Sequence, residues 1–515
     1  MTTTRSPLTG GLAEWIARRA DRRPDDVAII DAETGEELSY GDFFARIRAT
    51  AEGLRGRGVR RGDRVMLIME NRPEFLEYLF ATAALGAVAV PVNFRLSAPE
   101  IAYLIDDAQP TVLVHGDLLA GLATDAVAAA GLTPPQMINV DVAPVGEGLA
   151  GEMDLDPVSD DDVCLIMYTS GTTGFPKGAM ITHGHMRWNV FNMVMVDTGV
   201  NNTDVTLCAA PLFHIGALSL LAAPLLYVGG TVVLQRSFVP AETLRLFEKH
   251  RVSVCFLVPA MWAALSQVPT FDDVDVSAMR FVMSGGAPTP LPVIRFFLER
   301  GWAFLEGFGM TEFGPAALLL DNDHIVSHAG TVGRPATHVD AAVVDEADRP
   351  VAPGEIGELV LRGPVMFAGY WGLPQATAST QRGGWMHTGD LARMDADGFV
   401  SIVDRKKDMV ISGGENVYPA EVEQMLHQHP GVTDVAVIGV PDETWGETVA
   451  AVVVPAADAA VTEAELIDYC RSHIAHFKAP KAIHFAEELP RTATGKLLKR
   501  VLRQTYTGSG GAVTR

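Results

Sequence analysis

Short apolar runs alternate with amphipathic segments through the first 320 residues of the chain. Residues 64–69, 87–92 and 111–114 are rich in Val, Leu, Met or Ala, and each precedes a helical pattern that closes near Gly or Pro. Runs that are apolar throughout are typical of parallel strands covered on both faces. We therefore expect an α/β fold whose large N-terminal domain contains two parallel-type sheet subdomains.

The pattern changes after about residue 330. Short strand patterns at residues 341–344, 357–361 and 398–403 are joined by tight turns and predict a small β-rich subdomain. After residue 404 a compact α+β pattern follows, beginning with a helical segment at 417–429. The charged sequence Asp-Arg-Lys-Lys-Asp over residues 404–408 separates the two patterns. We predict an N-terminal domain over residues 1–404 and a C-terminal domain over residues 405–515.

Composition excludes several classes of partner. The chain is 48% hydrophobic and carries a formal net charge of −23, a field that repels nucleic acid and anionic lipid. The N-terminus lacks an apolar signal region, and four scattered cysteines predict buried free thiols in a reducing compartment. These are Cys164, Cys208, Cys255 and Cys470. We expect a cytoplasmic protein with neither a disulfide framework nor a zinc site.

One uncharged stretch, residues 205–235, is long enough to span a membrane. It is interrupted by Pro211, His214, Pro224 and the pair at 229–230, and it ends in a strand-like run. We therefore predict a strand, a buried helix kinked near Pro224 and a second strand, with no transmembrane segment.

The segment Tyr168–Gly178, here called the phosphate loop, is rich in groups that bind phosphate. It places four Ser or Thr residues and two glycines before Lys177, directly after an apolar run. Glycine lets backbone N–H groups turn inward, and such donors form a concavity that suits anions. The spacing is not that of a Walker A motif. A nucleoside triphosphate site is favoured over the alternative of a Gly/Ser/Thr surface turn.

Three later clusters also follow apolar strands, where an open α/β sheet presents its ligands. Residues 284–288 are small enough for a flat ring to lie on the backbone. Residues 307–312 combine the aromatic ring of Phe308 with the carboxylate of Glu312, which suits Mg²⁺. In the cluster 385–390, Asp390 suits ribose hydroxyls. Each of these carboxylates taken alone is more often a solvated turn residue than a ligand.

Together these segments resemble the acyl-adenylate-forming superfamily, and bacterial fatty-acyl-CoA synthetases in particular. The resemblance extends over about residues 11–505 and includes, in the family's order, segments 330–335, 354–359, 404–408, 411–419 and 490–496. It implies an enzyme that uses ATP, Mg²⁺ and coenzyme A. A carboxylic acid first attacks ATP, giving acyl-AMP and pyrophosphate, and the thiol of coenzyme A then displaces AMP.

The resemblance also implies roles for individual residues in the first step. Thr311 would contact the α-phosphate, Glu312 would hold Mg²⁺, and Lys496 would reach the α-phosphate and the attacking carboxylate. A solvated surface lysine is the alternative for Lys496. Phe308 stands where the family commonly has tyrosine. The phenylalanine ring can still stack, but any contact made by the tyrosine hydroxyl is lost. The remaining nucleotide contacts would come from Thr169, Ser170, Gly171, Thr172, Thr173, Gly174, Lys177, Gly285, Gly286, Ala287, Pro288, Glu306, Gly307, Phe308, Gly309, Met310, Asp390 and Arg405.

For the second step, the resemblance implies that the C-terminal domain is mobile and swings about Lys407. Gly413 and Gly414 would line the pantetheine tunnel. The implied contacts to the nucleotide part of coenzyme A are Trp445, Phe477, Lys478 and Lys481, for which ordinary surface packing is an equal alternative.

The acyl pocket implied by the resemblance is lined by small and apolar residues, which favours a sizeable hydrophobic acid over acetate. His214 either gates this pocket during catalysis or is a core histidine. The identity of the acid stays open. The implied lining is His214, Ala217, Val258, Gly286, Gly307, Met310 and Gly314.

Other functions of the same family stay open at this point. The acceptor is coenzyme A or, alternatively, a carrier protein acting in trans, and a luciferase-like monooxygenase is a further alternative. A half-reaction protein that binds acyl-AMP would need the same fold. A homodimer is neither required nor excluded by the sequence.

Overall fold

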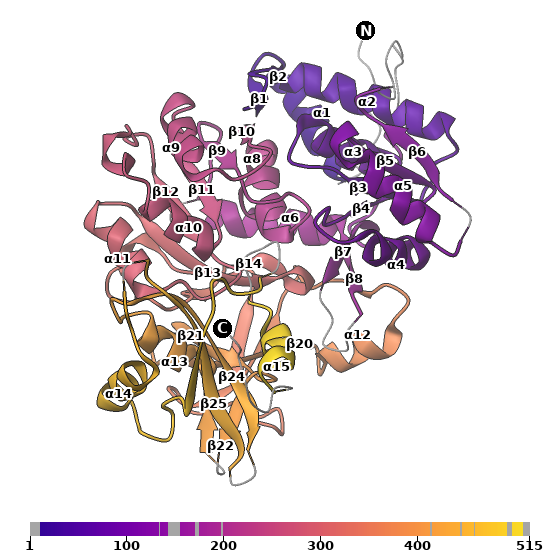
Figure 1. The fold of residues 1–515 in the computed structure, drawn as a ribbon. Coiled ribbons are helices and arrows are strands. Elements are labelled where there is room, and N and C mark those ends of the chain that lie inside the picture. The colour runs from indigo at the N-terminus through magenta and orange to yellow at the C-terminus, as the bar shows by residue number, and fades with distance from the viewer. Residues whose placement is uncertain are drawn as a thin grey trace.

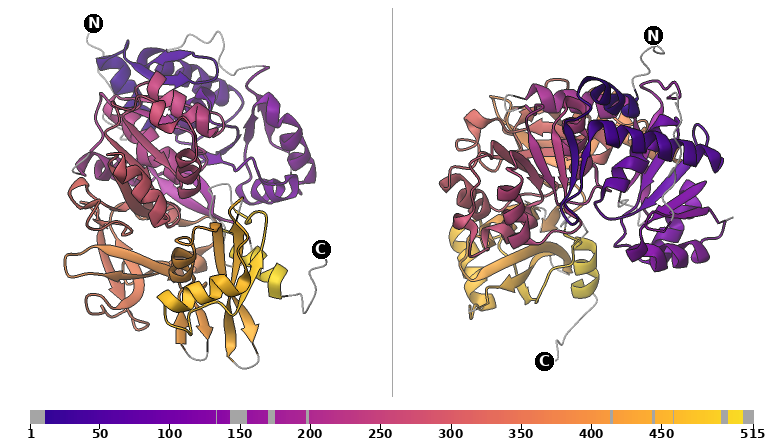
Figure 2. Two further views of the ribbon diagram at one scale, coloured as in Figure 1. Left: turned by 60° about the vertical axis from the view of Figure 1, so that its left-hand side comes forward. Right: turned by 90° about the horizontal axis from the view of Figure 1, so that it is seen from above.

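The structure is a computed structural model, and it describes residues 11–132, 134–142, 155–169, 175–196, 199–412, 415–442, 445–457, 459–491 and 497–507. Figure 1 shows two large α/β parts side by side, with the β-rich and C-terminal sheets beneath them. The same arrangement is seen from two other directions in Figure 2, where the C-terminal part is orange to yellow. The predicted α/β class with a small C-terminal α+β unit is confirmed.

The larger sheet has nine strands and a parallel centre. Its outer strands β2, β14 and β15 are antiparallel to their neighbours. The sequence pattern did not predict these antiparallel edges. In spatial order the strands are β15 (Arg334–Pro335), β14 (Gly314–Leu319), β13 (Phe304–Met310), β12 (Phe281–Ser284), β11 (Val254–Leu257), β9 (Val205–Cys208), β10 (Thr231–Leu234), β1 (Val27–Asp31) and β2 (Glu37–Ser39).

The second sheet has seven strands, and five of them are parallel. At one edge β8 and β18 run antiparallel, so the phosphate loop joins two strands of a hairpin and no helix follows it directly. The order is β18 (Gly369–Tyr370), β8 (Lys177–Thr182), β7 (Val163–Thr169), β4 (Val88–Pro91), β3 (Arg64–Ile68), β5 (Val112–His115) and β6 (Gln136–Asn139).

Two five-stranded sheets form the lower part of the molecule. In the β-rich sheet, β21 (Val400–Arg405) begins and ends two residues after the expected strand at 398–403. Its other strands are β16 (Asp340–Val344), β17 (Ile356–Arg362), β20 (Trp385–Met394) and β19 (Gln381–Arg382). The C-terminal sheet contains β23 (Glu415–Val417), β22 (Val410–Ser412), β25 (Gly446–Pro455), β24 (Val432–Asp442) and β26 (Ala482–Phe485).

Helices cover the sheets, and one of them joins the two large ones. Every residue of α3 except Glu74 is buried, because this helix packs against β1 of one sheet and β3 and β4 of the other. The helices are α1 (Leu12–Arg22), α2 (Tyr40–Gly56), α3 (Pro73–Ala84), α4 (Ala98–Ala108), α5 (Ala120–Ala129), α6 (His183–Met195), α7 (Ile215–Ala217), α8 (Ala223–Val228), α9 (Pro240–Lys249), α10 (Pro259–Ser266), α11 (Leu291–Glu299), α12 (Pro374–Thr380), α13 (Pro419–Leu426), α14 (Glu463–His473) and α15 (Lys499–Thr507).

The uncharged stretch at 205–235 is divided among five short elements. It runs from β9 through α7, the π-helical turn η2 (Leu218–Ala222) and α8 to β10. A π-helical turn was not predicted, and it lies where a kink near Pro224 was expected. Across the described ranges, no helix is both long enough and apolar enough to cross a membrane. The four cysteines are buried free thiols, as predicted.

Candidate active site

The hairpin β7–β8 positions both ends of the phosphate loop. Thr169 and Lys177 are paired across the two strands, so their side chains start from neighbouring backbone positions at the end of the hairpin. Ser170, Gly171, Thr172, Thr173 and Gly174 lie outside the described residues. The structure therefore places the two ends of the predicted loop together.

Glu312 lies close to this hairpin, although it is in the segment that joins β13 to β14 of the nine-stranded sheet. It is in the short 3₁₀ helix η4 (Thr311–Phe313), and it is 7% exposed. Its Oε1 accepts hydrogen bonds from the hydroxyl of Tyr370 over 2.8 Å and from that of Thr169 over 3.3 Å. A carboxylate fixed by hydroxyl donors beside a phosphate loop fits a Mg²⁺ ion, which prefers oxygen ligands.

Tyr370 is a site residue that the sequence analysis missed. It lies in β18, which pairs with β8, and its ring is 5.3 Å from the ammonium of Lys177. Burial and the neighbouring Glu312 raise the pKa of its phenol, which stays protonated and donates. Tyr370 thus contacts both the cation and the carboxylate of the site. No sequence spacing singled it out, because the contact depends on the β8–β18 pairing.

Asp390 and Arg405 form the second charged pair of the site. They are register partners on β20 and β21, and Arg405 Nε lies 2.6 Å from Asp390 Oδ1. Asp390 is 3% exposed. The two residues predicted to hold ribose are therefore brought together, with the carboxylate oriented by the guanidinium.

The segments predicted to hold adenine also meet. A methyl group on Gly285 would stand 3.3 Å from the carbonyl oxygen of Gly307, so the ends of β12 and β13 lie backbone to backbone. Gly286 has φ +86°, which favours glycine. Ala287 and Pro288 continue the same turn. These small residues leave the backbone open to a flat ligand.

Glu306 on β13 is a buried carboxyl at this edge. Its Oε2 accepts a hydrogen bond from the backbone N–H of Gly330 over 2.9 Å. Burial raises its pKa to about 7, although hydrogen bonds from Gly330 and Thr289 lower it. A carboxyl with this pKa changes charge near neutral pH. Phe308, Gly309 and Met310 follow on the same strand.

His214 lies at the start of α7, against the ring of Phe213 at 4.5 Å between centroids. Its Nε2 is buried and has no hydrogen-bond partner among the described residues. Burial lowers its pKa to about 4, with a smaller effect of Arg95, so the ring is neutral. A neutral, partly buried histidine fits the edge of a pocket, and the choice between gate and core residue stays a prediction.

The other predicted lining residues come from four elements around α7. Val258 caps α10, and a methyl group on Gly286 would stand 3.9 Å from its side chain. Ala217 ends α7, which contacts β11, β13 and β14. Gly307 and Met310 lie on β13, and Gly314 begins β14. The topology thus gathers the predicted acyl pocket at one end of the larger sheet.

Two polar residues on α6 face this region and were missed by the sequence analysis. A methyl group on Gly314 would stand 3.1 Å from Asn189 Oδ1 and 3.5 Å from His185 Nε2. Both side chains are buried, to 1% exposure each. Neither residue belongs to a motif, so no pattern along the chain singled them out.

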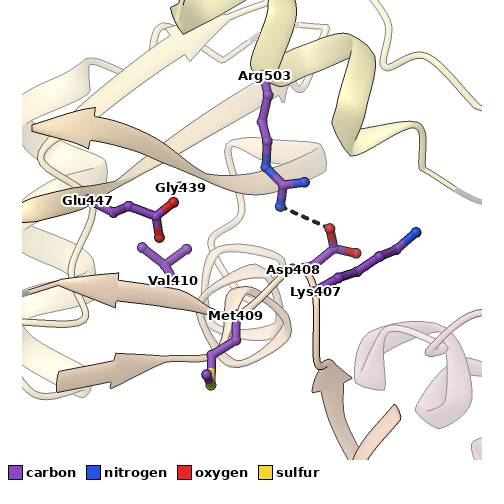
Figure 3. Close-up of a pocket in the computed structure, with 7 residues that line it drawn as sticks. All are labelled: Lys407, Asp408, Met409, Val410, Gly439, Glu447 and Arg503. Carbon is purple, nitrogen blue, oxygen red and sulfur yellow. Dashed lines mark hydrogen bonds and ion pairs between the residues drawn. The ribbon is translucent and has the colours of Figure 1, made fainter. Parts of the chain in front are cut away.

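The residues between β21 and β22 connect the β-rich sheet to the C-terminal sheet. Lys406 donates its backbone N–H to Gly389, and its ammonium lies 3.3 Å from Glu358 in β17. Asp408 instead forms an ion pair with Arg503 of α15 at 2.9 Å. Figure 3 shows Asp408 and Arg503 facing each other, with Lys407 beside them, at a pocket of about 240 Å³. Lys407 thus separates Lys406, which is held by the β-rich sheet, from Asp408, which is held by helix α15.

The charged side chains of Lys499, Glu423 and Asp404 form a cluster next to the end of β21. Lys499 of α15 pairs with Glu423 of α13 at 2.8 Å, and their side chains are 11% and 14% exposed. Asp404 Oδ2 accepts the backbone N–H of Ala420 over 2.9 Å. Burial lowers the pKa of Lys499, but Glu423 and Asp404 outweigh burial and hold it above its usual value. Asp404 therefore links β21 to α13 through a hydrogen bond and to α15 through the charge of Lys499.

The predicted coenzyme A contacts are spread over the C-terminal part. The ammonium of Lys478 pairs with both carboxylate oxygens of Glu421, at 2.7 and 2.8 Å. The rings of Trp445 and Phe477 are 51% and 39% exposed, and Lys481 uses its backbone N–H to extend the sheet at Val449. Gly413, Gly414 and Lys496 lie outside the described residues. Among the described residues of this set, the ammonium of Lys478 lies 5.9 Å from the ring centroid of Phe477.

Comparison with known proteins decides the family. The sequence model of the AMP-binding enzyme family matches residues 16–371, and that of the AMP-binding enzyme C-terminal domain matches residues 421–496. This chain belongs to the AMP-binding enzyme family. Its reaction is that of an AMP-forming acid–thiol ligase, which uses ATP and Mg²⁺ to activate a carboxylic acid as acyl-AMP and transfers the acyl group to coenzyme A.

Individual relatives cover almost the whole chain. A feruloyl-CoA synthase from Amycolatopsis sp is 44% identical over 499 residues, which are 96% of this chain and 99% of that protein. A long-chain-fatty-acid–CoA ligase from Mycobacterium tuberculosis is 36% identical over 500 residues, 96% and 98% of the two chains. The crystal structure of ATP-bound MatB from Rhodopseudomonas palustris matches with a TM-score of 0.88 at 34% identity, over 96% and 99% of the chains.

Proposed function

We propose that this ligase activates a bulky hydrophobic acid of the arylpropenoic class and transfers it to coenzyme A. The observation that carries the proposal is the 44% identity to feruloyl-CoA synthases from two genera over 96% of the chain. An indoleacetate–CoA ligase, whose acid is also aromatic, is 36% identical. The glycines at 286, 307 and 314 support the same substrate class, because they leave room for a planar ring.

In the proposed first step, the chain's own groups stabilise charge on the triphosphate. Lys177 and the hydroxyls of the phosphate loop hold the β- and γ-phosphates, and Thr311 donates to the α-phosphate. Glu312 holds Mg²⁺, which when bound neutralises charge on the phosphates. Asp390 and Arg405 bind the ribose hydroxyls. Lys496 orients the carboxylate for in-line attack and stabilises the charge at the α-phosphorus.

In the proposed second step, the C-terminal domain over residues 405–515 rotates about Lys407. The proposal is supported by the anchoring of Lys406 to the β-rich sheet and of Asp408 to α15. Rotation would separate Asp404 from Ala420, because these residues belong to different sides of the hinge. The same rotation would withdraw Lys496 and bring Gly413 and Gly414 to the pantetheine chain.

The acceptor and the setting of the reaction are part of the proposal. Coenzyme A is proposed as the thiol, with exposed Trp445 and Phe477 offering stacking surfaces for its adenine. A carrier protein in trans is the alternative acceptor. We propose that the enzyme acts in the cytoplasm, where ATP and coenzyme A are available, and that any homodimer forms without sharing the site.

A screen of carboxylic acids with ATP and Mg²⁺, with and without coenzyme A, tests the proposed function. Mass spectrometry is expected to detect arylpropenoyl-CoA only when coenzyme A is present, and acyl-AMP when it is absent. Turnover of straight-chain fatty acids in place of arylpropenoic acids would overturn the substrate class. Acyl-AMP without any thioester would overturn coenzyme A as the acceptor.

A further inference from the structure

The imidazole of His185 on α6 has hydrogen-bonding capacity that the protein does not use. The side chain is 1% exposed, and neither ring nitrogen has a hydrogen-bond partner among the described residues. Burial lowers its pKa to about 3, so the ring is neutral and presents one donor and one acceptor. A buried polar group without a partner is costly, and in a native protein it points to a ligand or a water.

Nε2 of His185 is directed at Gly314, one of the residues predicted to line the acyl pocket. This nitrogen lies 3.5 Å from the point where a methyl group on Gly314 would stand. Gly314 has φ +73°, and it follows η4, which carries Thr311 and Glu312.

The neighbouring amide is already occupied by the protein. Asn189 donates to the carbonyl oxygen of Ser219 over 2.5 Å and accepts from the backbone N–H of Ala316 over 3.4 Å. These bonds join α6 to the π-helical turn η2 and to β14. Asn189 therefore fixes the packing of α6 against η2 and β14, whereas the donor and the acceptor of His185 are available to a ligand.

We propose that His185 is a specificity-determining residue that hydrogen-bonds a hydroxyl group on the ring of an aromatic acid, at the end remote from the carboxylate. The inference rests on the proposed function, which places an aromatic acid in this pocket. A phenolic hydroxyl both donates and accepts, so it pairs with a neutral imidazole in either tautomer. An unsubstituted ring would leave both nitrogens unpaired, which a site of this kind penalises strongly.

The test compares two acids that differ by one hydroxyl, 4-hydroxycinnamic and cinnamic acid, on the purified full-length enzyme. The measured quantity is the ratio of their kcat/KM values for thioester formation. We expect the wild-type ratio to favour the hydroxylated acid by about tenfold or more, and the ratio of His185→Leu to fall toward one. A wild-type ratio near one, or an unchanged ratio in His185→Leu, would overturn the role of His185.

His183 supplies a matched control on the same helix. It is equally buried, but its Nδ1 accepts the backbone N–H of Leu12 over 3.2 Å, away from Gly314. His183→Leu is expected to lower stability and to leave the ratio of the two acids at its wild-type value. An equal fall of the ratio in both variants would show a general packing effect and overturn the proposal. If His185→Leu does not fold, His185→Phe replaces it, because phenylalanine keeps a ring without nitrogens, and its ratio is likewise expected to fall toward one.

The outcomes separate this inference from the proposed function. If the wild-type enzyme converts neither acid but converts a fatty acid, the proposed substrate class fails. If it converts both acids equally well, the substrate class stands and the role of His185 fails.

Discussion

The phenol of Tyr370 donates a hydrogen bond to Oε1 of Glu312 over 2.8 Å, across 58 positions of the sequence. The same ring lies beside the ammonium of Lys177. One aromatic side chain thus sets the distance between the group proposed to bind phosphate and the group proposed to bind Mg²⁺. The strand pair β8–β18 fixes that distance before either ligand arrives.

Tyr370→Phe is expected to weaken Mg²⁺ and ATP binding while the fold is kept. A residue that orients a metal ligand typically contributes about tenfold or more to metal affinity. The KM for Mg·ATP should rise by about tenfold in pyrophosphate-release assays. Thr169→Val, which removes the longer bond of 3.3 Å, should have a smaller effect. An unchanged KM for Mg·ATP in Tyr370→Phe would show that Glu312 does not need this donor.

Lys496→Ala and Lys407→Pro are expected to affect opposite half-reactions. Removing the ammonium of Lys496 should lower the rate of acyl-AMP formation by about a hundredfold, because it removes charge stabilisation at the reacting phosphorus. It should spare thioester formation from supplied acyl-AMP. Proline at 407 restricts φ at the proposed hinge and should impair thioester formation instead. Equal losses in both half-reactions for both variants would contradict domain rotation.

Lys499→Met is expected to destabilise the C-terminal part because it leaves Glu423 buried without its cation. Breaking one partner of a buried ion pair costs about 3 kcal/mol. Denaturant unfolding should measure this loss, and the double variant Glu423→Gln with Lys499→Met should recover part of it. Additive losses in the double variant would mean that the two side chains do not interact.

Glu306→Gln is expected to change the pH dependence of stability. The pKa of Glu306 is about 7 in the folded protein against an ordinary value of 4.5, so the folded state binds more protons between these values. Its ionisation therefore lowers stability as the pH rises from about 4.5 to 7. Glutamine keeps an acceptor for Gly330 and carries no charge. The stability gained by Glu306→Gln should grow by up to about 3 kcal/mol between pH 5 and pH 8.

Thermal unfolding at both pH values checks the prediction for Glu306. The melting temperatures of wild type and variant should lie close together at pH 5 and separate at pH 8, with the variant higher. A difference that is the same at both pH values would assign the effect to packing and not to ionisation.

The alternation of apolar runs predicted the sheets because buried parallel strands are apolar along their whole length. The family resemblance implied that Asp390 and Arg405 act together and that Glu312 acts with the phosphate loop, and the structure brings both sets of residues together. The antiparallel edges were missed, since an apolar run predicts a buried strand but not the direction in which its neighbour runs. The division of the uncharged stretch into α7, η2 and α8 was also missed, because periodicity does not separate a π-helical turn from an α-helix over so few residues.

Tyr370 and His185 could not be predicted for a different reason. Each acts on a site residue from a distant element, Tyr370 through the pairing of β18 with β8, and His185 through the packing of α6 on β14. Such contacts are decided by tertiary packing, and neither residue stands in a pattern with chemical meaning of its own. The family resemblance therefore supplied the proposed site residues, whereas the contacts that Tyr370 and His185 make around them came only from the structure.

The π-helical turn η2 also has a consequence for how pockets of this architecture diversify. In it the backbone N–H of Ala223 bonds to the carbonyl of Leu218, one residue farther back than in an α-helix. Deleting a single residue here would restore α-helical bonding and rotate His214 and Ala217 by about 100° relative to α8. Loss or gain of one residue in η2 would thus change the shape of the cavity while every strand of the nine-stranded sheet keeps its register.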